Sequence, residues 1–97
     1  MSTLQYRLPQ KRCLVTELPG PKSTALAARR RAAVGAGVTS VLPIYVADAD
    51  GAVVVDVDGN SLIDLGAGIA VTSVGASNPA VVAAVQQQVA RFTHTCF

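Results

Sequence analysis

Two Asp-Gly pairs, each placed between short apolar runs, constrain the fold of this chain more than any other feature. The pairs are Asp50-Gly51 and Asp58-Gly59, and the runs that they separate are residues 44–47, 53–57 and 62–65. Asp-Gly between apolar runs is a strong hairpin signal, because both residues tolerate a positive φ angle. The pattern therefore predicts a three-stranded antiparallel meander.

The middle run also predicts which face of the sheet is buried. Val53, Val55 and Val57 fall on one face of a strand, because successive side chains point to opposite sides. Val54, Asp56 and the following Asp58 fall on the other face. We expect the all-valine face to be the buried one.

Helical signals flank the meander on both sides. Residues 1–21 contain three prolines and predict an extended or loosely ordered arm. A helix over residues 23–34 is expected next, capped by Ser23 or Thr24 and ended by Gly35. Residues 66–77, which are rich in Gly, Ala and Ser, predict a loop with close backbone packing.

The second helix begins sharply after this loop. Asn78 is a good N-cap and Pro79 suits the first helical position. Apolar residues then recur at helical spacing and form a stripe. The stripe consists of Val82, Val85, Val89 and Phe92. The predicted fold class is α+β, ordered as arm, helix, three strands and helix.

The composition predicts a thin core. Hydrophobic residues make up 51% of the 97 residues, yet there are two Phe, two Tyr and no Trp. Small side chains bury little area each, so we expect the chain to need a partner surface. The chain ends at Phe97 directly after the second helix, and we expect it to be the beginning of a longer protein.

Charge and targeting signals exclude several classes of function. The net charge is +2, and three consecutive arginines at 29–31 would fan around a helix rather than form a stripe, which argues against a nucleic-acid partner. No run is long enough to span a membrane. Two cysteines do not make a disulfide framework, so a cytoplasmic location is predicted.

Three groups of residues suggest chemistry, but none completes a site. The acidic string at positions 48–60 opens like a calcium loop, but it has Ser61 where Gly belongs and Ala67 where the closing Glu belongs. Gly66-x-Gly68 lacks the third glycine of a dinucleotide fingerprint. His94 and Cys96 have no orienting acid nearby. Neither a metal site nor a catalytic residue is predicted in this chain.

Several segments together resemble one enzyme family. Residues 55–71, VDVDGNSLIDLGAGIAV, resemble the signature that opens the class III, fold-type I aminotransferases, which use pyridoxal 5'-phosphate (PLP). Residues 43–45 resemble the strand before it, and residues 78–85, NPAVVAAV, resemble the helix after it. Residues 93–97, THTCF, are similar to the SHTCF of bacterial 4-aminobutyrate aminotransferases. One departure is Ala76-Ser77-Asn78, where the family has His in two places.

The resemblance implies which residues meet the substrate. Ile69 would line the substrate pocket beside the carbon chain, and Gly68 would give close backbone access; the alternative for Ile69 is simple core packing. The family's Schiff-base lysine and its cofactor-binding residues would lie later in the chain. Lys11 and Lys22 lie in the arm and at a helix start, so cofactor-binding residues are not expected in this chain, which would be inactive alone.

The resemblance also implies an identity for the whole protein. Residues 1–21 would be an arm, and residues 22–97 the N-terminal segment of an aminotransferase domain. The expected function is that of a 4-aminobutyrate (ω-amino acid):2-oxoglutarate aminotransferase. The expected partners are the rest of the chain, a second subunit and an amino-acid substrate. Two alternatives remain: a fragment of an ornithine or acetylornithine aminotransferase, or a small non-catalytic α+β interaction module.

Overall fold

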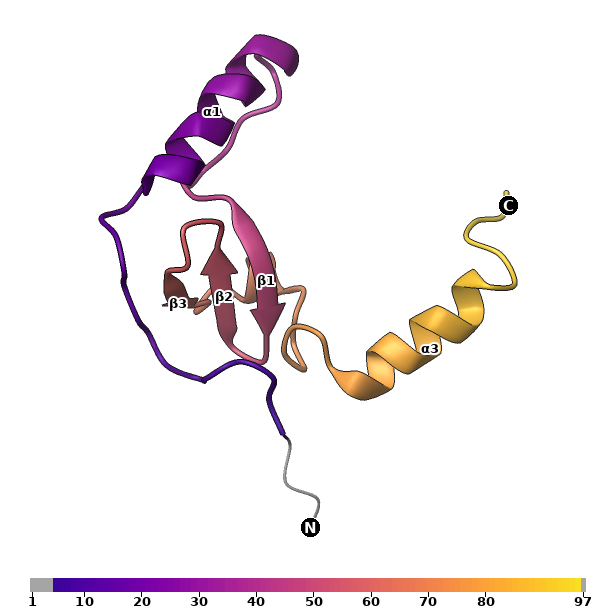
Figure 1. Ribbon diagram of the computed structural model, residues 1–97. Coiled ribbons are helices and arrows are strands. Elements are labelled where there is room, and N and C mark those ends of the chain that lie inside the picture. The colour runs from indigo at the N-terminus through magenta and orange to yellow at the C-terminus, as the bar shows by residue number, and fades with distance from the viewer. Residues whose placement is uncertain (1–4, 97) are drawn as a thin grey trace.

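The computed structural model describes residues 5–96 and shows a helix, a three-stranded antiparallel sheet and a second long helix (Figure 1). The strands are neighbours in the order β1-β2-β3. The elements are α1 (Pro21–Ala33), β1 (Val46–Asp50), β2 (Val53–Asp56), β3 (Ser61–Ile63), α2 (Ala67–Ala70) and α3 (Pro79–Val89). The predicted α+β class and the meander are confirmed.

The two turns of the meander are the Asp-Gly turns that the sequence predicts. Gly51 (φ 58°) and Gly59 (φ 90°) both adopt positive φ angles, which cost glycine little. Asp50 pairs with Val53 across the first turn, and Val55 pairs with Ser61 across the second. The register between β1 and β2 shifts between Val46 and Asp48.

The prediction of an all-valine buried face is only partly right. Val53 is buried, at 1% exposure, but Val55 and Val57 are only half-buried. Asp56, expected on the opposite face, is equally buried at 1% exposure. Its carboxylate Oδ1 accepts hydrogen bonds from the backbone N–H groups of Asp58 and Asn60, both at 2.9 Å, so burial leaves the charge well solvated by the turn.

Helix α1 begins two residues earlier than predicted, and neither Ser23 nor Thr24 caps it. Gly20 is the N-cap and provides no side-chain hydrogen bond. The carboxylate of Asp58 instead accepts from the backbone N–H groups of Lys22 (2.8 Å) and Ser23 (3.0 Å). Ser23 is itself buried, and its Oγ accepts a hydrogen bond from the backbone N–H of Tyr45 at 3.2 Å, which keeps the hydroxyl satisfied.

The described part of the arm, residues 5–20, is extended as predicted but well anchored. It runs from the β1–β2 turn around the β3 side of the sheet to α1 (Figure 1). Cys13 and Ser61 form an antiparallel bridge with N···O distances of 2.9 and 2.7 Å. Buried Asn60 accepts from the backbone N–H groups of Val15 (2.7 Å) and Thr16 (2.9 Å). The arm therefore belongs to the folded unit.

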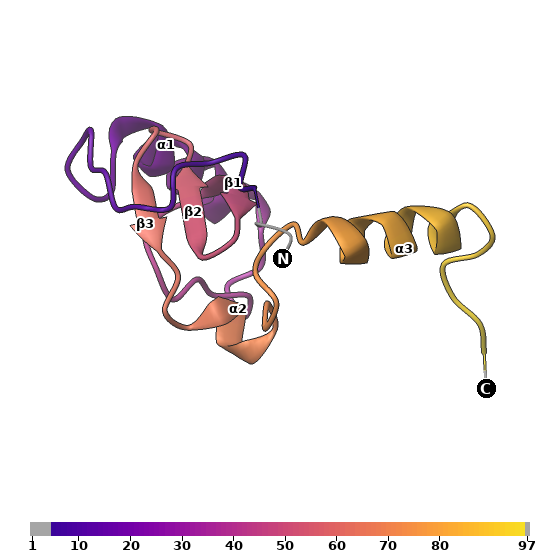
Figure 2. The same ribbon diagram turned by 90° about the horizontal axis from the view of Figure 1, so that it is seen from below.

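Helix α3 has the N-terminus that the sequence predicts. Pro79 is its first residue, and Asn78 Oδ1 accepts from the backbone N–H groups of Ala80 (3.0 Å) and Val81 (3.3 Å). The helix projects away from the sheet (Figure 2). Its apolar stripe is exposed along the length of the helix. The THTCF segment that follows includes Phe97, which lies outside the described residues.

Candidate substrate-facing loop

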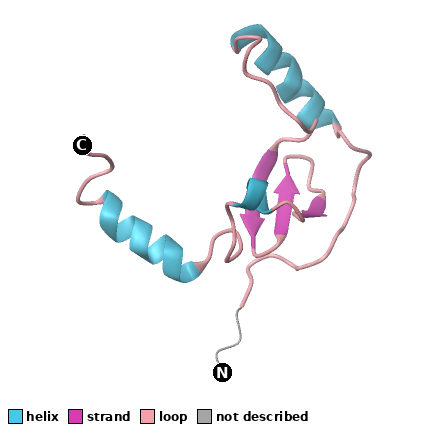
Figure 3. Ribbon diagram, turned by 180° about the vertical axis from the view of Figure 1, so that it is seen from behind, coloured by secondary structure: helices cyan, strands magenta, loops and turns pink. Residues whose placement is uncertain are grey.

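The segment that contains Gly68 and Ile69 is a loop whose two ends meet on the β1–β2 turn. At its start, the backbone N–H of Asp64 donates to the carbonyl O of Ala52 at 2.9 Å. At its end, Ala76 and Gly51 exchange two backbone hydrogen bonds of 2.8 and 3.0 Å. Seen from behind, the loop crosses over the sheet (Figure 3). We call residues 64–76 the closed loop.

The middle of the closed loop is a left-handed turn. All four residues of α2 have positive φ angles: Ala67 50°, Gly68 62°, Ile69 63° and Ala70 59°. This conformation costs a non-glycine residue about 1–2 kcal/mol, so the surrounding hydrogen bonds must hold it. The backbone N–H of Ala70 donates to Gly66 O at 2.9 Å, and that of Val71 to Ala67 O at 2.8 Å.

The left-handed turn leaves the side chain of Ile69 outside the sheet. Ile69 is 90% exposed and the neighbouring Leu65 is 93% exposed. Core packing of Ile69 therefore does not occur within residues 5–96. A Cβ at Gly68 would meet nothing within 4 Å, so the close packing predicted around this glycine is also absent here. The positive φ, rather than crowding, explains Gly68.

Close packing does occur at the neck of the closed loop. Gly75 has a φ of 88°, and a Cβ there would lie 3.1 Å from the Cα of Gly51. Gly51 and Gly75 thus let two backbones approach each other. Beneath the loop lies an open cavity of about 290 Å³, lined by Tyr6 of the arm as well as by Asp64 and Val74. The sequence predicts Gly51 only as a turn residue, because its contact with Gly75 joins positions 24 residues apart.

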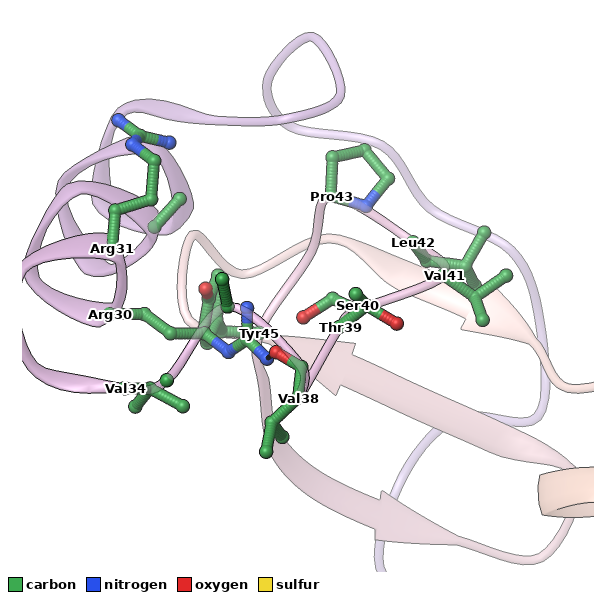
Figure 4. Close-up of a pocket in the computed structure, with 13 residues that line it drawn as sticks. Arg30, Arg31, Val34, Val38, Thr39, Ser40, Val41, Leu42, Pro43 and Tyr45 are labelled. Atoms are coloured by element: carbon green, nitrogen blue, oxygen red, sulfur yellow. Dashed lines mark hydrogen bonds between the residues drawn. The ribbon is translucent and has the colours of Figure 1, made fainter.

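A larger hollow of about 700 Å³ lies between α1 and residues 34–45 (Figure 4). Arg30 extends toward the loop, and its guanidinium donates to the carbonyl O of Val38. The remaining lining is mostly apolar, with Val34, Leu42 and Pro43 among it. Without an acid, base or nucleophile paired across it, this hollow offers no catalytic arrangement among the described residues.

Members of the acidic string make hydrogen bonds within the fold. Asp56 and Asn60 organise the second turn, and Asp58 caps α1. Partial desolvation raises the pKa of Asp58, but the N–H groups of Ser23 and Lys22 outweigh it and hold that pKa below its ordinary value. Arg7 holds the pKa of Asp48 below its ordinary range through an exposed ion pair of 3.1 Å. Among residues 5–96, no cluster of His, Cys, Asp or Glu has the geometry of a metal site.

The isolated candidates His94 and Cys96 stay isolated in the structure. Both are exposed in the segment after α3. Cys13 is exposed on the arm, and both cysteines are free thiols. The part of the chain that the structure describes contains no helix of a length and hydropathy that would cross a membrane.

Comparison with known proteins identifies the family. The family model for class-III aminotransferases matches residues 34–97. This chain belongs to the class-III aminotransferases. The match includes the meander, the closed loop and α3, and therefore every motif on which the sequence resemblance depended.

Individual relatives are all aminotransferases. The 4-aminobutyrate aminotransferase of Mycobacterium tuberculosis (strain ATCC 25618 / H37Rv) is 64% identical over 90 residues, which cover 93% of this chain and 20% of that protein. The 5-aminovalerate aminotransferase DavT of Pseudomonas putida is 49% identical over 73 residues, covering 75% of this chain and 17% of that protein. The acetylornithine aminotransferase of Mycobacterium bovis is 53% identical over 53 residues, which cover 55% of this chain and 13% of that protein.

This class-III aminotransferase segment spans about a fifth of the length of its mycobacterial relatives and corresponds to an N-terminal part of them. The comparisons support this interpretation over a small interaction module. Class-III aminotransferases depend on PLP. Neither Lys11 nor Lys22 lies in a site that fits the cofactor, because both are exposed and neither lines the hollows described above.

Proposed function

We propose that this chain is the N-terminal part of a PLP-dependent 4-aminobutyrate:2-oxoglutarate aminotransferase. The observation that carries the proposal is the 64% identity to the M. tuberculosis 4-aminobutyrate aminotransferase over 93% of the chain. The stretch similar to the acetylornithine enzyme is shorter, at 55% of the chain. 4-Aminobutyrate is therefore favoured over N-acetylornithine as the amino donor.

In this proposal, Ile69 and Gly68 form part of the wall of the substrate pocket. An ω-amino acid presents methylenes between two charged ends, and an aliphatic side chain can contact them without competing for either charge. The 90% exposure of Ile69 supports the role, since its side chain is free to meet a ligand or another part of the protein. Gly68 leaves open space beside it.

The catalytic groups lie outside this chain in the same proposal. The Schiff-base lysine and the residues that hold the cofactor would come from the remainder of the protein, and these 97 residues alone would be inactive. Scanning purified chain with PLP between about 300 and 500 nm tests this, since a stable imine band needs a buried lysine of lowered pKa.

The proposed partners are the rest of the aminotransferase chain and a second subunit. Large exposed apolar side chains support partners that would cover them, because isolated monomers rarely expose so many apolar side chains in one small unit. They include Val41, Leu65, Val71, Val85 and Phe92. A cytoplasmic location stays a prediction from the sequence.

The activity is tested in the complete protein that contains this segment. We expect 4-aminobutyrate and 2-oxoglutarate to be converted to succinate semialdehyde and glutamate, with 5-aminovalerate and N-acetylornithine as competing donors. Replacing Ile69 with Gln should lower kcat/KM for 4-aminobutyrate by roughly 10- to 100-fold, the value of one or two lost methylene contacts. Val38→Gln, at an exposed valine on a different loop, is the matched control.

The melting temperature of Ile69→Gln distinguishes a pocket-lining role of Ile69 from a core-packing role. If Ile69 instead packs in the core of the complete protein, Ile69→Gln would bury an unpaired amide and lower the melting temperature. Lost stability with an unchanged kcat/KM in the folded fraction would remove Ile69 from the pocket. A clear preference for N-acetylornithine would replace 4-aminobutyrate as the proposed donor.

A further inference from the structure

The β1–β2 turn is held from two sides by segments far apart in the sequence. The carbonyl O of Ala49 accepts from Arg7 Nη2 of the arm at 3.2 Å and from Ser77 Oγ, just after the closed loop, at 2.9 Å. The buried carboxylate of Asp50 accepts from the backbone N–H of Leu8 at 3.0 Å. The arm and the closed loop therefore share one attachment point.

Gln10 of the arm bonds to the turn on both sides of Gly51. Its Nε2 donates to the carbonyl O atoms of Leu8 and Asp50, both at 3.0 Å. Its Oε1 accepts from the backbone N–H of Ala52 at 3.0 Å. The carbonyl O of Ala52 in turn accepts from Asp64 at the start of the closed loop. One side-chain amide thus holds the residue to which the loop is tied.

Gly51 lies directly between the arm and the closed loop. A Cβ at Gly51 would lie 2.4 Å from Gln10 Oε1 and 2.6 Å from Tyr6 Cε1. On the loop side, the Cα of Gly51 lies 3.1 Å from the position of a Cβ on Gly75. The arm and the neck of the loop therefore both approach Gly51 closely, from opposite sides.

We propose that Gln10 is a positioning residue for the closed loop, and that the arm thereby adjusts the fit of Ile69 to the substrate. The left-handed turn of the loop is strained, so its shape depends on fixed ends. Gln10 fixes the turn to which both ends are bonded. The substrate part of this inference rests on the proposed function, whereas the coupling between arm and loop does not.

The coupling is tested by hydrogen exchange in the complete protein. Gln10→Ala removes two hydrogen bonds to the turn and one within the arm, and we expect the amides of Asp64 and Ala76 to exchange about 10-fold faster. The amide of Ser61, bonded to Cys13 elsewhere on the arm, is the internal reference. Lys11→Ala, at the exposed neighbouring residue, should change none of these rates.

A conservative variant and substrate choice complete the test. Gln10→Glu keeps an acceptor for Ala52 and should give intermediate exchange at Asp64. Gln10→Ala should change the ratio of kcat/KM for 4-aminobutyrate to that for 5-aminovalerate by about 5-fold or more. A merely structural role would lower both values equally and leave the ratio unchanged.

Two results would overturn the inference separately. Unchanged exchange at Asp64 and Ala76 in Gln10→Ala would refute the coupling between arm and loop. Faster exchange with an unchanged substrate ratio would refute the effect on substrate fit. If the wild-type protein turns over neither donor, the proposed function and the substrate part fail together, and the exchange data still decide the coupling.

Discussion

The buried amide of Asn60 offers a sharp test of how the arm is held. Its Nδ2 donates to Asp56 Oδ2 at 3.0 Å and to Thr16 Oγ1 at 2.7 Å, and the residue is 0% exposed. Asn60→Asp keeps the shape of the side chain but replaces this nitrogen with a carboxylate oxygen. Two carboxylates would then face each other in a buried site, and the pair should bind a proton rather than stay fully ionised.

The free energy of binding that proton sets how much stability Asn60→Asp loses. Repulsion between two charges about 3 Å apart is roughly 5.5 kcal/mol at an effective dielectric constant of about 20. Protonating a carboxyl with an ordinary pKa of about 3.9 costs about 4 kcal/mol near pH 7, so proton uptake is the cheaper outcome. The cost falls to about 1.5 kcal/mol near pH 5. The pKa of the introduced carboxyl is raised on folding, so stability is retained at low pH and lost as pH rises.

Hydrogen exchange at Val15 and Thr16 measures this effect, because both amides donate to the side chain of residue 60. In Asn60→Asp, the protection factors of these amides, corrected for the intrinsic pH dependence of exchange, should fall by roughly 100-fold between about pH 5 and about pH 7. Asn60→Ala removes both the Nδ2 donor and the Oδ1 acceptor of these amides without adding a charge, so its defect should not depend on pH. An equally pH-independent defect in Asn60→Asp would refute the reasoning.

Two further changes test the cap of α1 and the neck of the closed loop. Asp58→Ala should increase hydrogen exchange at the amide of Ser23, because that amide donates to the Asp58 carboxylate. In the wild type the pKa of Asp58 is lowered on folding. Protection of the Ser23 amide is therefore present above the ordinary carboxyl pKa and is lost as pH falls through the lowered pKa. Unchanged exchange at Ser23 in Asp58→Ala would contradict the role of Asp58 as the cap of α1. Gly75→Ala places a Cβ 3.1 Å from Gly51 at a φ of 88° and should loosen the Gly51–Ala76 pair by about 1–3 kcal/mol, seen as faster exchange at Ala76. Gly35→Ala, which meets nothing within 4 Å, should have no such effect, and equal effects of the two would argue against crowding at the neck.

The sequence by itself predicted the elements whose signals are local. The Asp-Gly turns, the order of the meander and the Asn78-Pro79 start of α3 all follow from the backbone preferences of neighbouring residues. The family also followed from the sequence, because its signature extends through one continuous segment around residues 55–71. Each of these features depends on residues within a few positions of one another.

Only the tertiary structure decided how these elements are joined. Asp58 caps a helix that begins 37 residues earlier, and Asn60 holds the arm 44 and 45 residues away. The alternation of its strand predicts that Asp56 lies on the exposed face, but Asp56 is buried. Burial is tolerated because N–H groups of the turn donate hydrogen bonds to its carboxylate. A hydrogen bond between distant segments leaves no periodic pattern in the sequence, since its partners meet only after the chain has folded.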